Sequence, residues 1–121
     1  CLVRKEKNIL RTLDCKNETC KALYQNAPKI TQYLCASCNN EWNQLQELLN
    51  LLSVNFIIDT MLVRGLDYYN KTVFEFCSTE LGAQNTFCGG GRYLLGKEAG
   101  AREDIASIGA GIGMGRLIML V

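Results

Sequence analysis

The 121-residue sequence has no marked excess of charge of either sign and no long hydrophobic run. Its 13 lysine and arginine residues nearly balance its 12 aspartate and glutamate residues, which leaves a net charge of +1. No basic stripe indicates nucleic-acid binding, so contact with RNA would need local patches or another part of the molecule. The longest apolar run is well short of the roughly 18 residues of a membrane helix. A membrane partner is therefore not expected.

A signal peptide and an initiator methionine are also lacking, since the sequence begins at Cys1. We therefore expect a piece of a longer protein. Cysteine, in contrast, is frequent. Seven cysteines without a leader favour a reducing cytoplasm, with free thiols or a bound metal, over a disulfide framework. With 48% hydrophobic and 21% charged residues, the chain is typical of one globular domain or part of one.

The chain up to about residue 53 has a helical pattern. The clearest helix is expected at residues 41–52, with Asn40 as its N-cap. Its apolar face would consist of Trp42, Leu45, Leu48, Leu49 and Leu52. Shorter helical segments are expected at residues 5–13, 18–25 and 30–35.

The chain after residue 53 has the pattern of strands. β-Branched and aromatic residues predict strands at residues 54–58, 72–77 and 86–88, and the three glycines at 89–91 are expected to end the last one. A further strand is expected after residue 105, leading into a helix from about Met114. Helices followed by meandering strands predict an α+β fold with antiparallel pairing, divided into residues 1–53 and 54–121.

The run LVRGLDYYNKTVFE at residues 62–75 combines a cation, a glycine and two adjacent aromatic hydroxyls. These groups suit a pocket for a small charged or aromatic molecule. The alternative is a surface arginine followed by ordinary strand tyrosines. Consecutive strand side chains point to opposite faces, so Tyr68 and Tyr69 share one pocket only if the chain bends or one supports it from behind.

Two glycine-rich segments follow. TFCGGGRY at residues 86–93 would let a ligand lie against the backbone, or it forms a simple turn. SIGAGIGMGRL at residues 107–117 superficially looks like a dinucleotide fingerprint, but no βαβ pattern flanks it.

Four cysteines in the helical half have a spacing that suits a structural zinc site. Cys15 and Cys20 are separated by four residues, and Cys35 and Cys38 by two. Four thiolates suit tetrahedral zinc, although four free thiols are the alternative. Cys77 and Cys88 lie in apolar strand contexts and are expected to be buried thiols.

All of these motifs resemble those of histidyl-tRNA synthetases, which are class II aminoacyl-tRNA synthetases. Residues 62–75 resemble their histidine-binding signature, residues 86–93 the segment that follows it, and residues 107–117 the third class II signature motif. The cysteine pattern is similar to that of a helical insertion in some bacterial members. The resemblance implies a helical insertion segment, then part of an antiparallel sheet and a C-terminal helix of the catalytic domain.

The resemblance also implies roles for individual residues. Arg64 would contact the α-phosphate and the substrate carboxylate, stabilising charge that develops at phosphorus. The histidine pocket would include Tyr68, Tyr69, Gly90 and Tyr93. Gly111, Gly113 and Arg116 would hold ATP, bound with magnesium as a substrate complex, and Arg116 would donate to the γ-phosphate. The sequence departs from the family at Leu94, where an aspartate is usual, and at Gly115, where a glutamate is usual.

The function implied for the parent protein is that of a cytoplasmic, homodimeric histidine–tRNA ligase. Such an enzyme activates histidine with ATP to histidyl-adenylate and transfers it to tRNA(His). The first two class II motifs do not occur in the sequence, so we expect the chain alone to be inactive. Two alternatives remain: a catalytically silent, histidine-binding paralogue of the type that regulates ATP phosphoribosyltransferase, and a zinc-stabilised interaction module.

Overall fold

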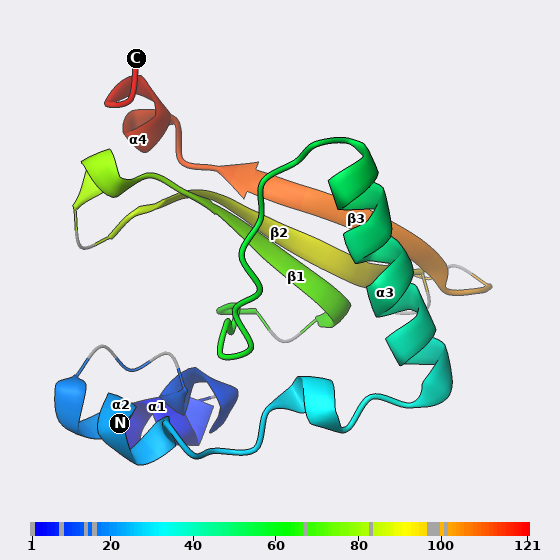
Figure 1. Ribbon diagram of the computed structural model, residues 1–121, viewed down its shortest axis with the longest axis horizontal. Helices are drawn as coiled ribbons and strands as arrows, with labels where there is room; N and C mark the ends of the chain where they lie inside the picture. Colours follow the sequence, from blue (N-terminus) through cyan, green and yellow to red (C-terminus); the bar gives the residue numbers. More distant parts are fainter. Residues whose placement is uncertain are drawn as a thin grey trace. The chain divides into compact units, whose positions relative to one another are not determined.

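The computed structural model describes the chain except residues 1, 8, 14, 16, 67, 83, 97–99 and 101. It divides into two compact units, Cys1–Gly65 and Leu66–Val121. The first unit is helical, and the second consists of an antiparallel sheet and a short helix (Figure 1). The α+β fold predicted from the sequence is therefore confirmed. The division into an insertion segment and a catalytic part at residue 53 stays a prediction.

The first unit begins with short helical segments. They are α1 (Leu2–Lys7), the 3-10 turn η1 (Ile9–Thr12), α2 (Glu18–Tyr24) and the 3-10 turn η2 (Ile30–Gln32). Helical structure thus occurs in each of the three regions expected, in shorter pieces than the sequence pattern suggested.

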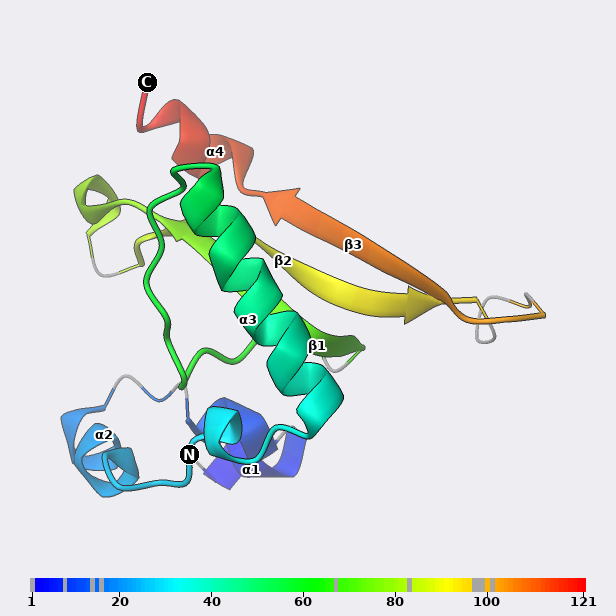
Figure 2. The same cartoon turned by 45° about the vertical axis from the view of Figure 1, so that its right-hand side comes forward.

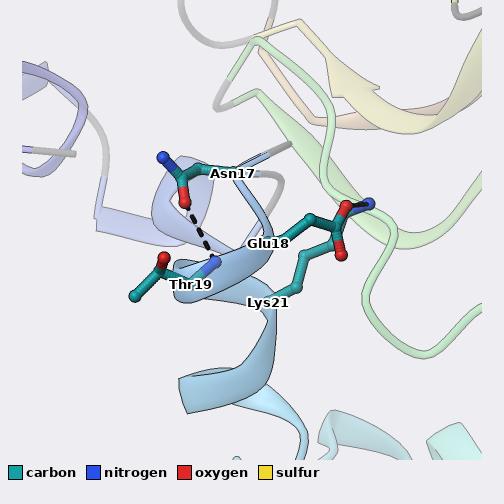
Figure 3. A network of polar contacts seen from close by, with 4 residues as sticks. All are labelled: Asn17, Glu18, Thr19 and Lys21. Carbon is teal, nitrogen blue, oxygen red and sulfur yellow. Dashed lines mark hydrogen bonds and ion pairs between the residues drawn. The ribbon is translucent and has the colours of Figure 1, made fainter.

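Helix α2 begins at a well-defined cap (Figure 3). The side-chain Oδ1 of Asn17 accepts a hydrogen bond from the backbone N–H of Thr19 at 2.9 Å. One turn on, Lys21 Nζ lies 2.8 Å from Glu18 Oε1. The cap satisfies one of the free N–H groups of the first turn, whereas the ion pair is exposed and adds little stability.

The longest helix, α3 (Ala36–Leu51), begins five residues earlier than predicted. Cys35 is its N-cap, and the backbone N–H of Asn39 already donates to the Cys35 carbonyl at 2.9 Å. The prediction that Asn40 caps this helix is therefore wrong. A polar residue with cap propensity is tolerated inside a helix when the preceding turn is also helical.

The predicted apolar face of α3 is only partly covered. Trp42, Leu45 and Leu49 are half-buried, whereas Leu48 and Leu52 are exposed. The expected strand at residues 54–58 does not form, and Ile57 is 94% exposed. A β-branched run becomes a strand only where a neighbouring strand pairs with it, which the local pattern cannot reveal.

The second unit contains three antiparallel strands in the order β1-β2-β3 (Figure 2). They are β1 (Tyr69–Cys77), β2 (Thr86–Leu95) and β3 (Ile105–Ile112), and the short helix α4 (Met114–Ile118) follows β3. The strand and helix expected at the end of the chain are thus confirmed. The short 3-10 turn η3 (Thr79–Leu81) lies in the connection between β1 and β2.

The three glycines at 89–91 do not end β2, which corrects the prediction. They are buried inside the strand, where Gly90 pairs with Phe74 of β1 and Ala110 of β3. A Cβ at Gly90 would collide with the Gly109 carbonyl oxygen and come within 2.9 Å of Phe74 Cζ. Glycine is needed here because neighbouring strands and a phenylalanine ring approach the backbone closely.

The two strand cysteines differ in burial. Cys88 is 7% exposed, as expected for a core thiol, whereas Cys77 is exposed and corrects the prediction. Cys77 is the last residue of β1 and follows a shift in register after Phe76, so neighbouring strand residues do not cover it. Among the described residues, no helix is long and apolar enough to cross a membrane.

Candidate functional site

Three tyrosines form a cluster at one end of the sheet. The rings of Tyr68 and Tyr69 have centroids 4.5 Å apart, and the ring of Tyr93 lies edge-on to them, at 5.7 Å from Tyr68 and 6.5 Å from Tyr69. The Tyr68 hydroxyl donates to the Tyr69 hydroxyl at 3.4 Å. These tyrosines were all predicted from the sequence, and the structure brings them together.

A bend in β1 follows the two adjacent tyrosines of this cluster. Tyr69 pairs with Tyr93, but the next paired residue, Val73, is opposite Gly91, so β1 has extra residues at this point. Lys71 has a φ of +62°, a left-handed conformation that bends the strand. Tyr68 and Tyr69 precede this bend, and their rings lie in one cluster with Tyr93.

An arginine on β2 ties the bend to the sheet. Arg92 Nη1 donates to the Asn70 side-chain Oδ1 across the two strands. Asn70 lies directly between Tyr69 and the bend at Lys71. Sequence reasoning missed this contact, because the cross-strand pairing that brings Arg92 to Asn70 is not visible in either motif.

Glycines make room for two of the tyrosine rings. A Cβ at Gly91 would lie 2.8 Å from Tyr69 Cδ1, and one at Gly109 would lie 3.1 Å from the Tyr93 hydroxyl oxygen. The ring of Tyr93 therefore lies over the backbone of Gly109. These glycines accommodate the protein's own aromatic rings, whereas the sequence suggested that the glycine run accommodates a ligand.

Arg64 is half-buried and belongs to the first unit, whereas the tyrosine cluster belongs to the second unit. Its place in the pocket therefore stays a prediction. Asp67, the carboxylate of the same motif, lies outside the described residues.

A second cluster surrounds Arg116 in α4. Its Nη1 donates to the backbone carbonyls of Gln84, at 3.2 Å, and Thr86, and its Nη2 donates to the Gln84 side-chain Oε1 at 2.7 Å. The backbone N–H of Gly113, the N-cap of α4, donates to the Phe87 carbonyl at 2.8 Å. These bonds attach α4 to the start of β2.

The Thr86 side chain extends this cluster towards β1. Its hydroxyl donates to Glu75 Oε2 at 2.7 Å while its carbonyl accepts from Arg116. Sequence reasoning identified Arg116 but missed its contacts to Gln84 and Thr86, because these residues precede it by about thirty positions and no local pattern indicates that pairing. The other predicted ATP residue, Gly111, lies in β3 opposite Gly89, with open space where a Cβ would be.

The four cysteines with zinc-like spacing do not form a metal site among the described residues. No group of three or more histidine, cysteine, aspartate or glutamate residues in that part of the chain is arranged to hold a metal ion. The described donor set therefore does not fit a four-thiolate zinc site. Cys15 and Cys20 are half-buried near α2, and Cys35 and Cys38 lie at the start of α3.

Cys35 and Cys38 interact with each other. A backbone hydrogen bond from Cys38 is the largest cause that lowers the pKa of the exposed Cys35 thiol, followed by a hydrogen bond from the Cys38 side chain. Both bonds stabilise the thiolate. In the described structure the closely spaced pair, Cys35 and Cys38, therefore interacts directly.

The chain is similar to known proteins along nearly its whole length. The family model described as histidyl-tRNA synthetase matches residues 3–117. The chain is 48% identical over 120 residues to a histidine–tRNA ligase of Clostridioides difficile, covering 98% of this chain and 29% of that protein. It is 47% identical to a histidine–tRNA ligase of Caldanaerobacter subterraneus, covering 98% of this chain and 28% of that protein. The chain therefore spans less than a third of the length of these curated relatives.

Proposed function

The chain belongs to the histidyl-tRNA synthetase family, and from this we propose that it is part of the catalytic domain of a histidine–tRNA ligase. The parent protein would activate histidine with ATP, forming histidyl-adenylate, and transfer the histidyl group to tRNA(His). Support comes from relatives of that name that are 47–48% identical across nearly the whole chain. We also propose that the parent is a cytoplasmic homodimer.

The tyrosine cluster is the observation that supports a histidine pocket best. It presents aromatic ring edges and two hydroxyls, Tyr68 and Tyr69, within 3.4 Å of each other. An imidazole ring packs against aromatic surface and exchanges hydrogen bonds with hydroxyl groups through its ring nitrogens. A pocket built to hydrogen-bond these nitrogens discriminates strongly against an apolar isostere, which would leave the hydroxyls unpaired. Gly90 and Tyr93 complete the proposed pocket.

The second cluster supports a triphosphate site. Arg116 would donate to the γ-phosphate of ATP, which enters with magnesium as its substrate complex, and Gly111 and Gly113 would lie beside it. Arg64 would contact the α-phosphate and the histidine carboxylate, where negative charge increases during adenylate formation. The protein thus supplies position and positive charge, and the bond that breaks lies within ATP itself.

The alternative of a silent, histidine-binding paralogue rests on Gly115. The position normally holds a glutamate in the family, and its loss removes an acidic group beside the proposed triphosphate site. In the structure, no atom lies within 4 Å of the place where a Cβ at Gly115 would be, so glycine is not required by packing. Histidine binding by the full-length protein without use of ATP would therefore favour this paralogue.

Removal of either hydroxyl of the tyrosine pair tests the histidine pocket. In the full-length protein we expect Tyr68→Phe and Tyr69→Phe each to raise KM for histidine by about three- to tenfold, the effect of losing one hydrogen bond. KM for ATP should stay unchanged. The measurement is histidine-dependent ATP–pyrophosphate exchange at varied histidine concentration.

The matched control is Tyr33→Phe, because Tyr33 is 73% exposed and lies in the first unit. This variant should behave like the unmodified protein. If both pocket variants also keep the original KM for histidine, the tyrosine cluster is not the histidine pocket.

A further inference from the structure

Arg116 is already held through both terminal nitrogens of its guanidinium. An arginine side chain has five N–H donors in a rigid planar fork. Three hydrogen bonds run from Nη1 and Nη2 to the Gln84 carbonyl, the Thr86 carbonyl and the Gln84 side-chain Oε1. One short segment at the start of β2 therefore takes both hydrogens of Nη1 and one hydrogen of Nη2.

The donors that remain are the Nε–H and the second hydrogen of Nη2. By the covalent geometry of the guanidinium, the Nε–H lies parallel to one N–H of Nη2 along a side edge. Two parallel N–H groups form the bidentate arrangement that suits a phosphate or carboxylate group. The contacts to Gln84 and Thr86 thus use Nη1 and Nη2 and leave the Nε–H for a phosphate oxygen.

The partners of Arg116 do not neutralise its charge. All three acceptors are neutral amide or carbonyl oxygens. Glu75, the acidic group of this network, accepts from the Thr86 hydroxyl at 2.7 Å. The guanidinium therefore keeps its full positive charge for an anion.

We propose that Gln84 is a positioning residue for ATP, which acts by holding Arg116 in place for the triphosphate. The proposal rests on the proposed role of Arg116 in ATP binding. Gln84 contributes twice, through its backbone carbonyl and through its side chain, and only the side-chain contact depends on the residue type. A guanidinium fixed before ATP arrives loses less conformational freedom on binding, which strengthens binding.

Substitution of Gln84 separates this role from folding. Gln84 is exposed, so its replacement does not open a core cavity. In the full-length protein, Gln84→Met keeps the length of the side chain but removes the acceptor. We expect it to raise KM for ATP about fivefold, the effect of one weakened hydrogen-bonded contact, without changing KM for histidine or the thermal unfolding midpoint.

A second variant tests the charge argument. Gln84→Glu keeps an acceptor oxygen but places a carboxylate beside the guanidinium, where it neutralises the charge and competes with the phosphate. We expect a larger rise in KM for ATP than with methionine, and this rise should diminish at high ionic strength. The matched control is Asn85→Ala, an exposed neighbour that does not contact Arg116 among the described residues; KM for ATP should not change.

The results also distinguish this proposal from the proposed function. If Arg116→Ala raises KM for ATP but both Gln84 variants leave it unchanged or lower it, Gln84 does not position Arg116, while the ATP site stands. If Arg116→Ala itself leaves KM for ATP unchanged, the proposed ATP site is wrong and the role of Gln84 is refuted with it.

Discussion

Replacement of Arg116 by alanine in the full-length protein is expected to lower kcat/KM for ATP about 100-fold in pyrophosphate exchange. The variant loses a bidentate, charge-assisted contact worth about 3 kcal/mol, and each 1.4 kcal/mol corresponds to a factor of ten. KM for histidine should change much less, because the tyrosine cluster is built from β1 and β2 rather than from α4.

Two variants serve as controls for this result. Arg116→Lys keeps the charge but loses the planar fork, so it should recover only part of the activity. Arg102→Ala makes the same chemical change at an exposed position and should leave the exchange rate unaltered. An Arg116→Ala protein with normal kinetics for ATP would show that this arginine only attaches α4 to β2.

Replacement of Gly90 by alanine is expected to destabilise the sheet by about 2–3 kcal/mol, the cost of overpacking a site that cannot relax. The added Cβ would collide with the Gly109 carbonyl oxygen, which is backbone held in a strand pair, and would approach Phe74 Cζ within 2.9 Å. The thermal unfolding midpoint of the full-length protein, measured without ligands, should fall clearly.

Gly111→Ala is the matched control for this substitution. Gly111 lies in the neighbouring strand β3, where no atom lies within 4 Å of a Cβ at this position. Its replacement should change the free energy of unfolding by no more than about 0.5 kcal/mol. Equal midpoints for the Gly90 and Gly111 variants would contradict the packing described for β2.

Local sequence patterns suffice to predict a strand where a partner strand lies in the same unit. The β-branched and aromatic strand expected at residues 72–77 lies within β1, and the strand expected after residue 105 is β3. Each has a partner strand in the same unit. Residues 54–58 have the same composition but form no strand. The difference lies in pairing, which depends on the rest of the fold.

The glycines show a similar limit of sequence reasoning. The run at 89–91 looked like a strand terminator or a ligand cradle, yet a Cβ at Gly90 would meet Phe74 and the backbone of β3, and one at Gly91 would meet Tyr69. A glycine required by close strand packing cannot be distinguished in sequence from a glycine required by a turn or by a ligand.

The candidate site was predicted in its residue types but not in its contacts. The residues of the tyrosine cluster were foreseen because a family motif marks them, whereas the sequence left open whether the chain bends there or one tyrosine supports the pocket from behind. The attachment of Arg116 to Gln84 and Thr86 was not foreseen, because it joins segments about thirty positions apart. The cysteine spacing predicted four ligands for zinc, whereas no group of three or more metal-binding side chains is arranged to hold a metal among the described residues.

The central claim is that this chain supplies part of a histidine–tRNA ligase active site that is completed by the rest of the parent protein. The measurement that tests it most directly is histidine-dependent ATP–pyrophosphate exchange, compared between this chain and the full-length protein with Gly115 retained. We predict exchange by the full-length protein and none by the chain alone. Absence of exchange in the full-length protein, with histidine still protecting it against thermal unfolding, would contradict the claim and favour the silent histidine-binding paralogue.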